Sequence, residues 1–312
     1  MIKKKLILGT QCIGRDIDFK IANNFLDFSF DNNIRELDTA ERYPFPENNK
    51  NFGLTEKIIG YWIRKSKKRS KIKIYTKVTG RNFGEISKIQ SCRLTPKRII
   101  ISAENSLKRL KSDYIDVYYL HWPDRFTNNF GRKYYNPDKD IKFNSIEDQL
   151  EAMYKLKKSG KILNYGLSNE TAWGIMKFYN YGLKNRFFPN LQEEYSIINR
   201  NAERSIKEIV LREKLKFYAY SPLSGGLLTG KYHSKNYKGG RLNIYKNKSQ
   251  RLSTDARFRR TKKLINFCNS NSLNLINLSL SFLAQQKFVN GIIIGSSSKK
   301  QLLDILNIIK KP

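Results

Sequence analysis

The feature that most constrains this chain of 312 residues is a regular alternation of short apolar runs with longer amphipathic segments. Eight of the runs are typical of buried strands, and a segment with helical periodicity follows each of them. Strands that are each followed by a helix form a parallel sheet with right-handed crossovers. The predicted strands are Leu6–Leu8, Ile34–Asp38, Ile72–Thr76, Tyr114–Leu120, Ile162–Leu167, Asn190–Glu193, Lys216–Tyr220 and Gly291–Ile294. We therefore expect an α/β fold, a closed (β/α)8 TIM barrel in which residues 1–312 form a single domain.

The amphipathic segments predict the helices that would surround such a barrel. Thr95 is a favourable N-cap before Pro96, and Gly160 is a favourable residue just beyond a helix end. The Gly- and Lys-rich stretch Ser224–Ser253 is expected to be a long loop. The predicted helices are Phe19–Asn32, Leu54–Lys65, Pro96–Leu110, Ile146–Ser159, Ala172–Asn180, Ala202–Arg212, Asp255–Asn269, Leu278–Gln285 and Lys299–Ile309.

The principal alternative is an open, doubly wound sheet that binds a dinucleotide through a G-x-G-x-x-G turn. Gly9 and Gly14 follow the first predicted strand, but their spacing does not match that motif. Gly225, Gly226 and Gly230 do not match it either. The sequence therefore favours the closed barrel.

Composition restricts the cellular setting of the protein. No apolar run reaches the roughly 18 residues that a membrane-spanning helix requires. The apolar stretch after Lys3, Lys4 and Lys5 is too short for a signal peptide, so we expect a cytoplasmic protein with no membrane partner. The three cysteines, Cys12, Cys92 and Cys268, lie far apart and predict reduced thiols and no metal site.

The formal net charge of +33 raises the question of a polyanionic partner, because a basic surface attracts nucleic acid without sequence specificity. The basic residues are, however, spread over every predicted helix and form no single arm or patch interleaved with aromatic residues. We interpret the charge as a compositional bias and expect no specific nucleic-acid partner. Nucleic-acid binding is kept as an alternative that predicts a steep dependence on salt.

Four polar side chains stand at or just after the ends of three consecutive predicted strands. Asp38 ends the second strand and Tyr43 lies on the loop that follows, whereas Lys77 and His121 end the third and fourth strands. Catalytic groups of a closed α/β barrel gather at the carboxyl ends of its strands. The spacing therefore predicts that these four side chains meet at one rim of the barrel.

These residue types suit the reduction of a carbonyl group. A nearby ammonium such as that of Lys77 would lower the pKa of the Tyr43 phenol, and Asp38 would hold the ammonium charged and in place. Tyr43 would then donate a proton, while a neutral His121 would hydrogen-bond the substrate oxygen. Because no side chain supplies hydride, the arrangement implies a nicotinamide or flavin cofactor.

At these residues the sequence resembles the aldo-keto reductases. The resemblance rests on Asp38 to Tyr43, on the strand ending in Lys77, and on Tyr114 to Asp116 leading to His121-Trp122-Pro123. It extends over nearly the whole chain. The loop that continues from Tyr43 through Pro44, Phe45 and Pro46 to Glu47 is similar to the bacterial Tas-like branch of the family.

The resemblance implies NADP(H) as cofactor and a small-molecule carbonyl compound as substrate, and it gives no oligomeric state. It implies Tyr43 as the general acid, with Asp38, Lys77 and His121 as its catalytic partners and Trp122 in the substrate pocket. It further implies that Ser168, Asn169 and Gln192 bind the nicotinamide carboxamide and that Tyr220 stacks on its ring. The segment that would bind the 2′-phosphate is Gly295, Ser296, Ser298, Lys299, Lys300 and Gln301.

Physical reasoning supports the phosphate assignment independently, since small residues before a helix N-terminus expose backbone N–H groups to an anion. Lys299 and Lys300 would add positive charge there and favour NADP over NAD. The alternative function is a non-enzymatic NADP(H)-binding sensor or regulatory subunit built on the same barrel.

Overall fold

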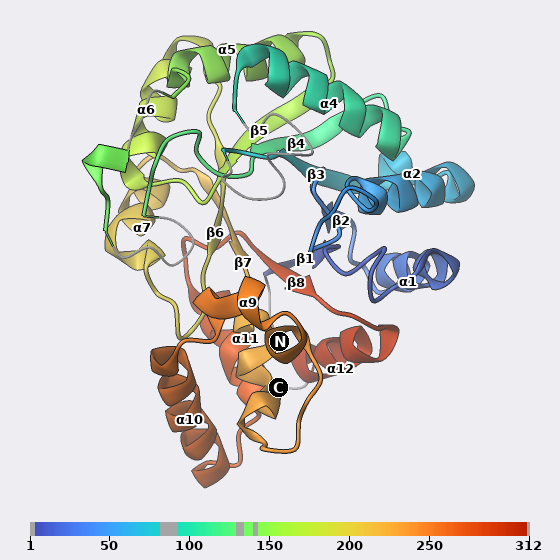
Figure 1. Ribbon diagram of the computed structural model, residues 1–312, viewed down its shortest axis with the longest axis vertical. Coiled ribbons are helices and arrows are strands. Elements are labelled where there is room, and N and C mark those ends of the chain that lie inside the picture. The colour runs from blue at the N-terminus through green and yellow to red at the C-terminus, as the bar shows by residue number, and fades with distance from the viewer. Residues whose placement is uncertain (1–3, 82–92, 129–133, 140–142, 311–312) are drawn as a thin grey trace.

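The computed structural model describes residues 4–81, 93–128, 134–139 and 143–310 (Figure 1). Eight parallel strands form a closed barrel in the order of the sequence. The strands are β1 Lys5–Gly9, β2 Glu36–Asp38, β3 Lys73–Val78, β4 Ile115–Leu120, β5 Ile162–Ser168, β6 Asn190–Glu194, β7 Lys216–Tyr220 and β8 Gly291–Gly295. The barrel is closed by β1 and β8, which pair from Lys5 opposite Gly291 to Gly9 opposite Gly295. The predicted barrel is therefore confirmed.

The longer helices surround the barrel and follow the strands as the sequence predicts (Figure 1). Thr95 Oγ1 accepts a hydrogen bond from Arg98 N at 3.2 Å and caps the helix that begins at Pro96. Gly160 has a φ of +72° just beyond the end of another helix, a conformation that favours glycine. These helices are α1 Phe19–Asp31, α2 Leu54–Ser66, α4 Pro96–Leu110, α5 Ile146–Lys158, α6 Ala172–Gly182, α7 Ala202–Arg212, α10 Asp255–Ser270, α11 Leu275–Gln285 and α12 Lys299–Lys310. None of the helices in the described ranges combines the length and the apolar character needed to cross a membrane.

The stretch predicted as a long loop is instead a series of short helical turns, which we call the strap (residues 224–253). Its turns are η4 Ser224–Thr229, η5 Lys231–His233, α8 Arg241–Ile244, α9 Lys246–Ser249 and η6 Gln250–Leu252. Leu227, Leu228, Leu242 and Leu252 of the strap are buried together with Ile198 in a small core of their own. The loop prediction was wrong because these leucines, two of them adjacent and two isolated, show no helical period, yet they form a buried cluster that orders the strap.

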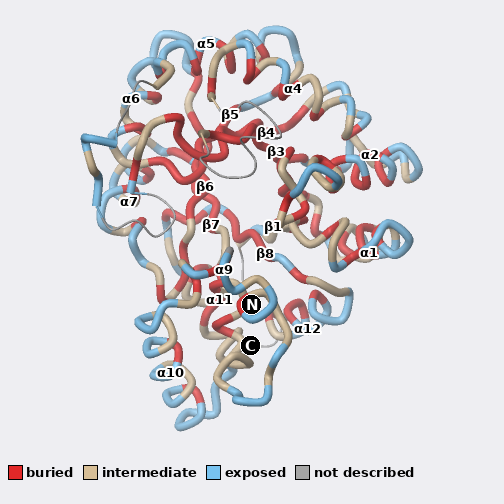
Figure 2. The backbone as a smooth tube through the Cα atoms, in the orientation of Figure 1, coloured by how far each residue is buried: buried red, intermediate tan, exposed pale blue. Residues whose placement is uncertain are grey.

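Most buried side chains lie on the strands and on the inner faces of the surrounding helices (Figure 2). A second core fills the interior of the barrel itself. It consists of Ile7, Tyr75, Val117, Tyr119, Tyr218 and Ile293. Because side chains alternate between the two faces of a strand, the residue two positions after each inward tyrosine also points inward. Tyr75 therefore places Lys77 at the rim of the barrel, and Tyr119 places His121 there.

Of the cysteines, Cys12 and Cys268 are free thiols, and Cys92 lies outside the described residues.

Gly60 of α2 provides a test of how closely the helices pack. A Cβ atom at Gly60 would lie 2.1 Å from the carbonyl oxygen of Arg109 and 2.7 Å from the carbonyl carbon of Leu110 in α4. We predict that Gly60→Ala lowers the free energy of unfolding by about 1–3 kcal/mol, although alanine is the better helix former. Lys57→Ala, at an exposed position of the same helix, is the matched control and should change stability little. Equal urea midpoints for the two variants would contradict the close packing of α2 on α4.

Candidate active site

A cleft of about 1380 Å³ lies at the carboxyl ends of the strands, beneath the strap. Trp122, which follows β4, and Gly295, at the end of β8, line it from opposite sides of the barrel. The cleft brings together most of the residues singled out in the sequence, which are Asp38, Tyr43, His121, Trp122, Ser168, Asn169, Gln192, Tyr220, Gly295, Ser296 and Gln301. Lys77 is buried beneath it, whereas Ser298, Lys299 and Lys300 do not line it.

Lys77 and Asp38 form a buried ion pair on the floor of the cleft. Lys77 Nζ donates hydrogen bonds to Asp38 Oδ1 at 2.7 Å, to Asp38 Oδ2 at 2.8 Å and to the carbonyl oxygen of Thr39 at 2.7 Å. Asp38 Oδ1 also accepts from Gln192 Nε2 at 2.7 Å. Burial lowers the pKa of the Lys77 ammonium, and the Asp38 carboxylate opposes that shift. The three protons of the ammonium are thus all used by Asp38 and Thr39.

Tyr43 is held at the wall of the cleft by the turn that follows β2. Its N–H donates to the carbonyl oxygen of Ala40 at 3.0 Å. Glu41, in the middle of the turn, is buried and accepts hydrogen bonds from Thr79 N and from Arg98 Nη2, both at 2.7 Å. These bonds to β3 and α4 fix the turn and therefore the position of the Tyr43 ring.

The electrostatics of Tyr43 differ from the sequence-based prediction. The ammonium of Lys77 lies 5.5 Å from the centre of the Tyr43 ring and donates no hydrogen bond to it. Burial raises the pKa of the Tyr43 phenol, and the Asp38 carboxylate raises it further, whereas Arg42 and Arg241 oppose the shift. The predicted lowering of this pKa by Lys77 is therefore wrong. The phenol is fully protonated at neutral pH and holds a proton that it can donate.

His121 lies beside Tyr43, and the two rings meet edge to face with their centres 6.0 Å apart. On its other side, the imidazole packs against Trp122 at a centre-to-centre distance of 4.8 Å. Burial lowers the pKa of His121 well below its ordinary value, and the charges of Lys77 and Arg42 lower it further. Its Nδ1 atom is buried and makes no hydrogen bond within the described part of the chain. His121 is therefore a neutral imidazole whose Nδ1 atom is buried without a hydrogen-bond partner among the described residues.

Asn169 connects the ends of three strands on the opposite side of the cleft. It adopts a left-handed backbone conformation with a φ of +55°. Its Nδ2 donates to the carbonyl oxygen of His121 at 2.9 Å, and its Oδ1 accepts from Tyr220 Oη at 2.5 Å. Ser168 Oγ donates to the carbonyl oxygen of Gln192 at 2.8 Å. The four residues predicted to bind a nicotinamide thus lie in one hydrogen-bonded group beside the catalytic candidates.

The segment predicted to bind the 2′-phosphate lies on the β8 side of the cleft. Gly295 ends β8, and the turn that follows leads directly into α12. Ser298 Oγ accepts from Gln301 N at 3.2 Å, and Gln301 Oε1 accepts from Ser297 N at 3.1 Å. Lys299 is exposed and leans over the Phe28 ring at 4.7 Å, and Lys300 is exposed as well.

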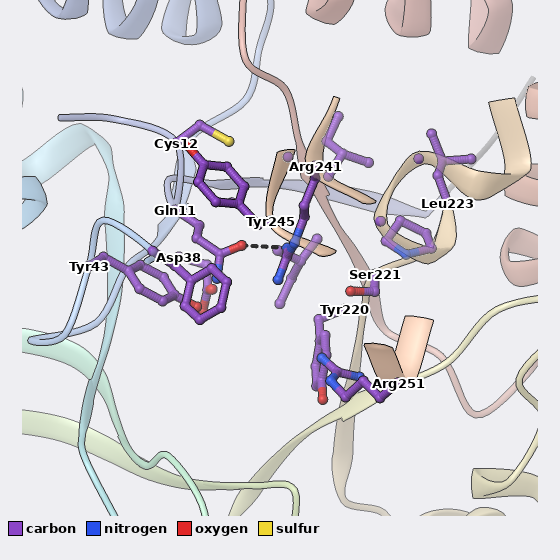
Figure 3. Close-up of a pocket in the computed structure, with 18 of the residues that line it drawn as sticks. Gln11, Cys12, Asp38, Tyr43, Tyr220, Ser221, Leu223, Arg241, Tyr245 and Arg251 are labelled. Atoms are coloured by element: carbon purple, nitrogen blue, oxygen red, sulfur yellow. Dashed lines mark hydrogen bonds between the residues drawn. The ribbon is translucent and has the colours of Figure 1, made fainter. Parts of the chain in front are cut away.

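Several residues that line the cleft were not predicted from the sequence. Gln11 follows β1 at the same rim as Asp38 and Lys77, so the rule that placed those residues could have found it. Arg241 and Arg251 reach the cleft from the strap, on either side of Tyr220 in the view of Figure 3. Glu194 at the end of β6 forms ion pairs with Arg251 and with Arg257, the latter at 2.6 Å, and so ties the strap to the barrel. The sequence stretch Ser221–Arg251 resembles the segment that closes over the cofactor pyrophosphate in the family, but no local pattern singles out these two arginines.

Comparisons with known proteins agree with this geometry. The sequence profile of the aldo/keto reductase family matches residues 5–312. Protein tas of Escherichia coli K12 is 32% identical over 298 residues, which cover 95% of this chain and 86% of that protein. An aldo-keto reductase of Babesia bovis is 33% identical over 250 residues, which cover 75% of this chain and 87% of the relative. Aflatoxin B1 aldehyde reductase member 2 of Rattus norvegicus is 29% identical over 236 residues, which cover 75% of this chain and 56% of the relative.

The closed barrel and the polar residues at its rim are typical of one class of oxidoreductase. The comparisons show that the chain belongs to the aldo/keto reductase family. The similarity to protein tas covers almost the whole chain, and so the resemblance to the Tas-like branch is confirmed as well.

The lowered pKa of His121 predicts a pH-dependent contribution to stability. In the unfolded chain this imidazole gains a proton below about pH 6.5, whereas the folded protein resists protonation until a lower pH. The free energy of unfolding should therefore fall by up to about 1.4 kcal/mol for each pH unit below about 6.5. In His121→Asn this part of the slope should be absent.

Urea unfolding at pH 7, 6 and 5 measures both slopes. His233→Asn is the matched control. His233 is the only other histidine in the sequence, and because it is less buried than His121 it should contribute less to the slope. If the wild-type protein and His121→Asn had parallel slopes, His121 would not be a buried neutral imidazole.

Proposed function

We propose that this protein reduces an aldehyde or ketone to the corresponding alcohol with NADPH, and that Tyr43 donates the proton. The observation that carries the proposal is the meeting of Tyr43 and His121 edge to face at the wall of the cleft, directly above the Lys77–Asp38 ion pair. The rat relative is named as an aldehyde reductase, which supports the same type of reaction.

Each catalytic candidate has a role that follows from its environment. The Tyr43 phenol carries its proton at neutral pH, as an unperturbed phenol also does, and it gives this proton to the carbonyl oxygen as negative charge develops there. The neutral imidazole of His121 donates a hydrogen bond to the same oxygen and so orients the carbonyl group. NADPH, when bound, supplies the hydride.

Lys77 and Asp38 act as positioning residues. The ion pair fixes the floor of the cleft beneath Tyr43, with the Lys77 ammonium 5.5 Å from the centre of the Tyr43 ring. Because Lys77 donates all three protons to Asp38 and Thr39, it makes no hydrogen bond to the Tyr43 phenol and acts by holding the floor of the cleft in place. Trp122 and Phe45 form the apolar wall against which the substrate lies.

The chemistry of the remaining lining residues fits an extended dinucleotide. Asn169, Ser168 and Gln192 present amide and hydroxyl groups suited to a carboxamide, and Tyr220 presents an aromatic face suited to stacking on a nicotinamide ring. On the β8 side, the turn after Gly295 leads into the N-terminus of α12, and a helix N-terminus is a favourable place for a phosphate. Lys299 and Lys300 add the positive charge that favours NADP over NAD.

The first test is the conversion of Tyr43 to phenylalanine. We predict that Tyr43→Phe lowers kcat/KM for aldehydes by about 10²- to 10⁴-fold, because the proton donor is lost while the ring is kept. The affinity for NADPH, measured by quenching of tryptophan fluorescence, should remain close to that of the wild-type protein. Tyr61→Phe, at an exposed position of α2, is the control and should match the wild-type protein in both measurements.

Two outcomes would contradict the proposal. Equal turnover by the wild-type protein and Tyr43→Phe would show that Tyr43 is not the proton donor. Tight binding of NADPH without turnover of any aldehyde or ketone would instead identify a cofactor-binding sensor.

A second test concerns the preference for NADP. We predict that Lys300→Ala raises the Kd for NADPH on the order of 10-fold, because a charge-assisted contact to the 2′-phosphate is lost. The Kd for NADH should change much less, since NADH lacks that phosphate. Lys155→Ala removes the same charge from an exposed position of α5 and should leave both dissociation constants unchanged. Equal effects of Lys300→Ala on NADPH and NADH would show that Lys300 does not contact the 2′-phosphate.

A further inference from the structure

A second pocket lies at the amino ends of the strands, on the face of the barrel opposite the catalytic cleft, and we call it the amino-end pocket. Its volume is about 280 Å³, which is close to the lower end of the range for small-molecule sites, roughly 300–1,000 Å³. It shares no lining residue with the cleft among the residues that the structure describes. Its polar lining residues include Lys5, Lys73, Asn164, Asn190, Lys216 and Asn290.

The pocket is formed by a polar layer of inward-facing side chains. In a closed α/β barrel, such a layer consists of four side chains from alternate strands and is usually built from bulky apolar residues. Here the four strands β1, β3, β5 and β7 contribute Lys5, Lys73, Asn164 and Lys216. Each lysine is the first residue of its strand and stands two positions before a side chain of the barrel interior, so it points inward as well.

The carboxylates beside the pocket already have cationic partners. Glu36 Oε1 lies 2.7 Å from the ammonium of Lys5, and Glu36 Oε2 accepts a hydrogen bond from Tyr75 Oη at 2.6 Å. Asp116 Oδ2 lies 2.8 Å from the guanidinium of Arg69. Each of these two carboxylates therefore balances one cation and leaves no negative charge for the other lysines of the layer.

Lys73 and Lys216 carry uncompensated charge. Neither forms an ion pair within the described part of the chain, and both are exposed at the opening of the pocket. Their strands, β3 and β7, lie four positions apart in the ring of eight, so the two ammonium groups approach the pocket from opposite sides. Because like charges that face one small pocket repel each other, an anion between them would lower the free energy of the folded state.

Neutral hydrogen-bond donors stand beside these two charges. Asn290 Oδ1 accepts from the backbone N–H of Phe217 at 2.8 Å, whereas its Nδ2 makes no hydrogen bond among the described residues. The side chain of Asn164 makes none either in that part of the chain. Primary amides and ammonium groups both donate to oxygen, and together they suit an anion that offers several acceptor oxygens.

We propose that the amino-end pocket binds the phosphate group of a small molecule, with Lys73 and Lys216 holding the group from opposite sides. A phosphate monoester carries a charge of about −1.5 to −2 at pH 7, which matches the two uncompensated lysines better than the single charge of a carboxylate does. Its oxygens accept charge-assisted hydrogen bonds from both ammonium groups. The inference goes beyond the proposed reduction, since the pocket lies on the other face of the barrel.

The test is isothermal titration of the full-length protein with glycerol 3-phosphate and with inorganic phosphate, in chloride buffer of constant ionic strength. We expect the wild-type protein to bind glycerol 3-phosphate, and we expect Lys73→Gln and Lys216→Gln each to raise its Kd on the order of 10-fold. Equal affinity for inorganic phosphate would identify the free phosphate group as sufficient, and weaker affinity would identify a phosphate ester as the ligand. Binding of neither compound would overturn the proposal.

Two further variants separate the contact from the net charge of +33. Lys73→Arg keeps the positive charge and should keep part of the affinity for glycerol 3-phosphate. Lys155→Gln removes one charge from an exposed position of α5 and should leave the Kd as in the wild-type protein. If Lys155→Gln weakened binding as much as Lys73→Gln, the phosphate would be an adventitious ion only, and the proposed site would be wrong.

Measurements with NADPH distinguish this pocket from the cofactor cleft. Lys73→Gln should bind NADPH as the wild-type protein does, and saturating NADPH should leave the Kd for glycerol 3-phosphate unchanged. Displacement of glycerol 3-phosphate by NADPH would place the phosphate in the cleft and overturn the proposal. Binding of glycerol 3-phosphate that depends on Lys73 would support the pocket even if the protein reduced no aldehyde or ketone, so the two proposals fail independently.

Urea unfolding checks that the variants fold. In chloride buffer the midpoint of the double variant Lys73→Gln/Lys216→Gln should match or exceed that of the wild-type protein, because two repelling charges are removed. Glycerol 3-phosphate should raise the midpoint of the wild-type protein and should raise that of the double variant much less. Equal increases in both proteins would contradict binding between the two lysines.

Discussion

The buried ion pair between Lys77 and Asp38 is the interaction on which the rest of the site depends. It joins neighbouring strands at the floor of the cleft, and the bond from Gln192 to Asp38 extends it across the barrel to β6. A buried pair of this kind contributes little net stability, but removing one partner leaves an unpaired charge and costs about 3–5 kcal/mol. The pair is therefore held in one geometry, and the Tyr43 ring lies above a charge whose position is fixed.

The layer of tyrosines beneath the ion pair explains why that geometry is rigid. Tyr75 Oη donates to Glu36 Oε2 at 2.6 Å, and the Tyr75 ring packs 5.6 Å from Tyr218 and 6.3 Å from Tyr119, measured between ring centres. These large side chains fill the interior of the barrel, where a cavity would otherwise let the strands shift. The rim residues therefore lie directly on a tightly packed aromatic layer, and this packing restricts the movement of their polar groups.

The sequence was sufficient for those parts of the structure that depend on a local period. The alternation of strands and helices predicts the barrel, and the period of two along β3 and β4 predicts that Lys77 and His121 share the rim with Asp38. It could not predict contacts between distant segments that no pattern connects, such as the bond from Arg241 to Gln11 across 230 residues. The pKa of Tyr43 was predicted with the wrong sign, because the sequence does not reveal that the phenol is buried and lies near the Asp38 carboxylate.

Because of this layered interior, insertions within the strands and insertions within the loops have different consequences. An insertion of one residue in β3 or β4 would turn Lys77 or His121 away from the rim and, at the same time, turn a barrel-filling tyrosine toward the helices. Phe45 and Arg241 lie outside the strands, in segments whose length can vary without disturbing the packed interior of the barrel. The rim residues on the strands and the loop residues around the cleft therefore lie in segments that differ in their tolerance of insertion and deletion.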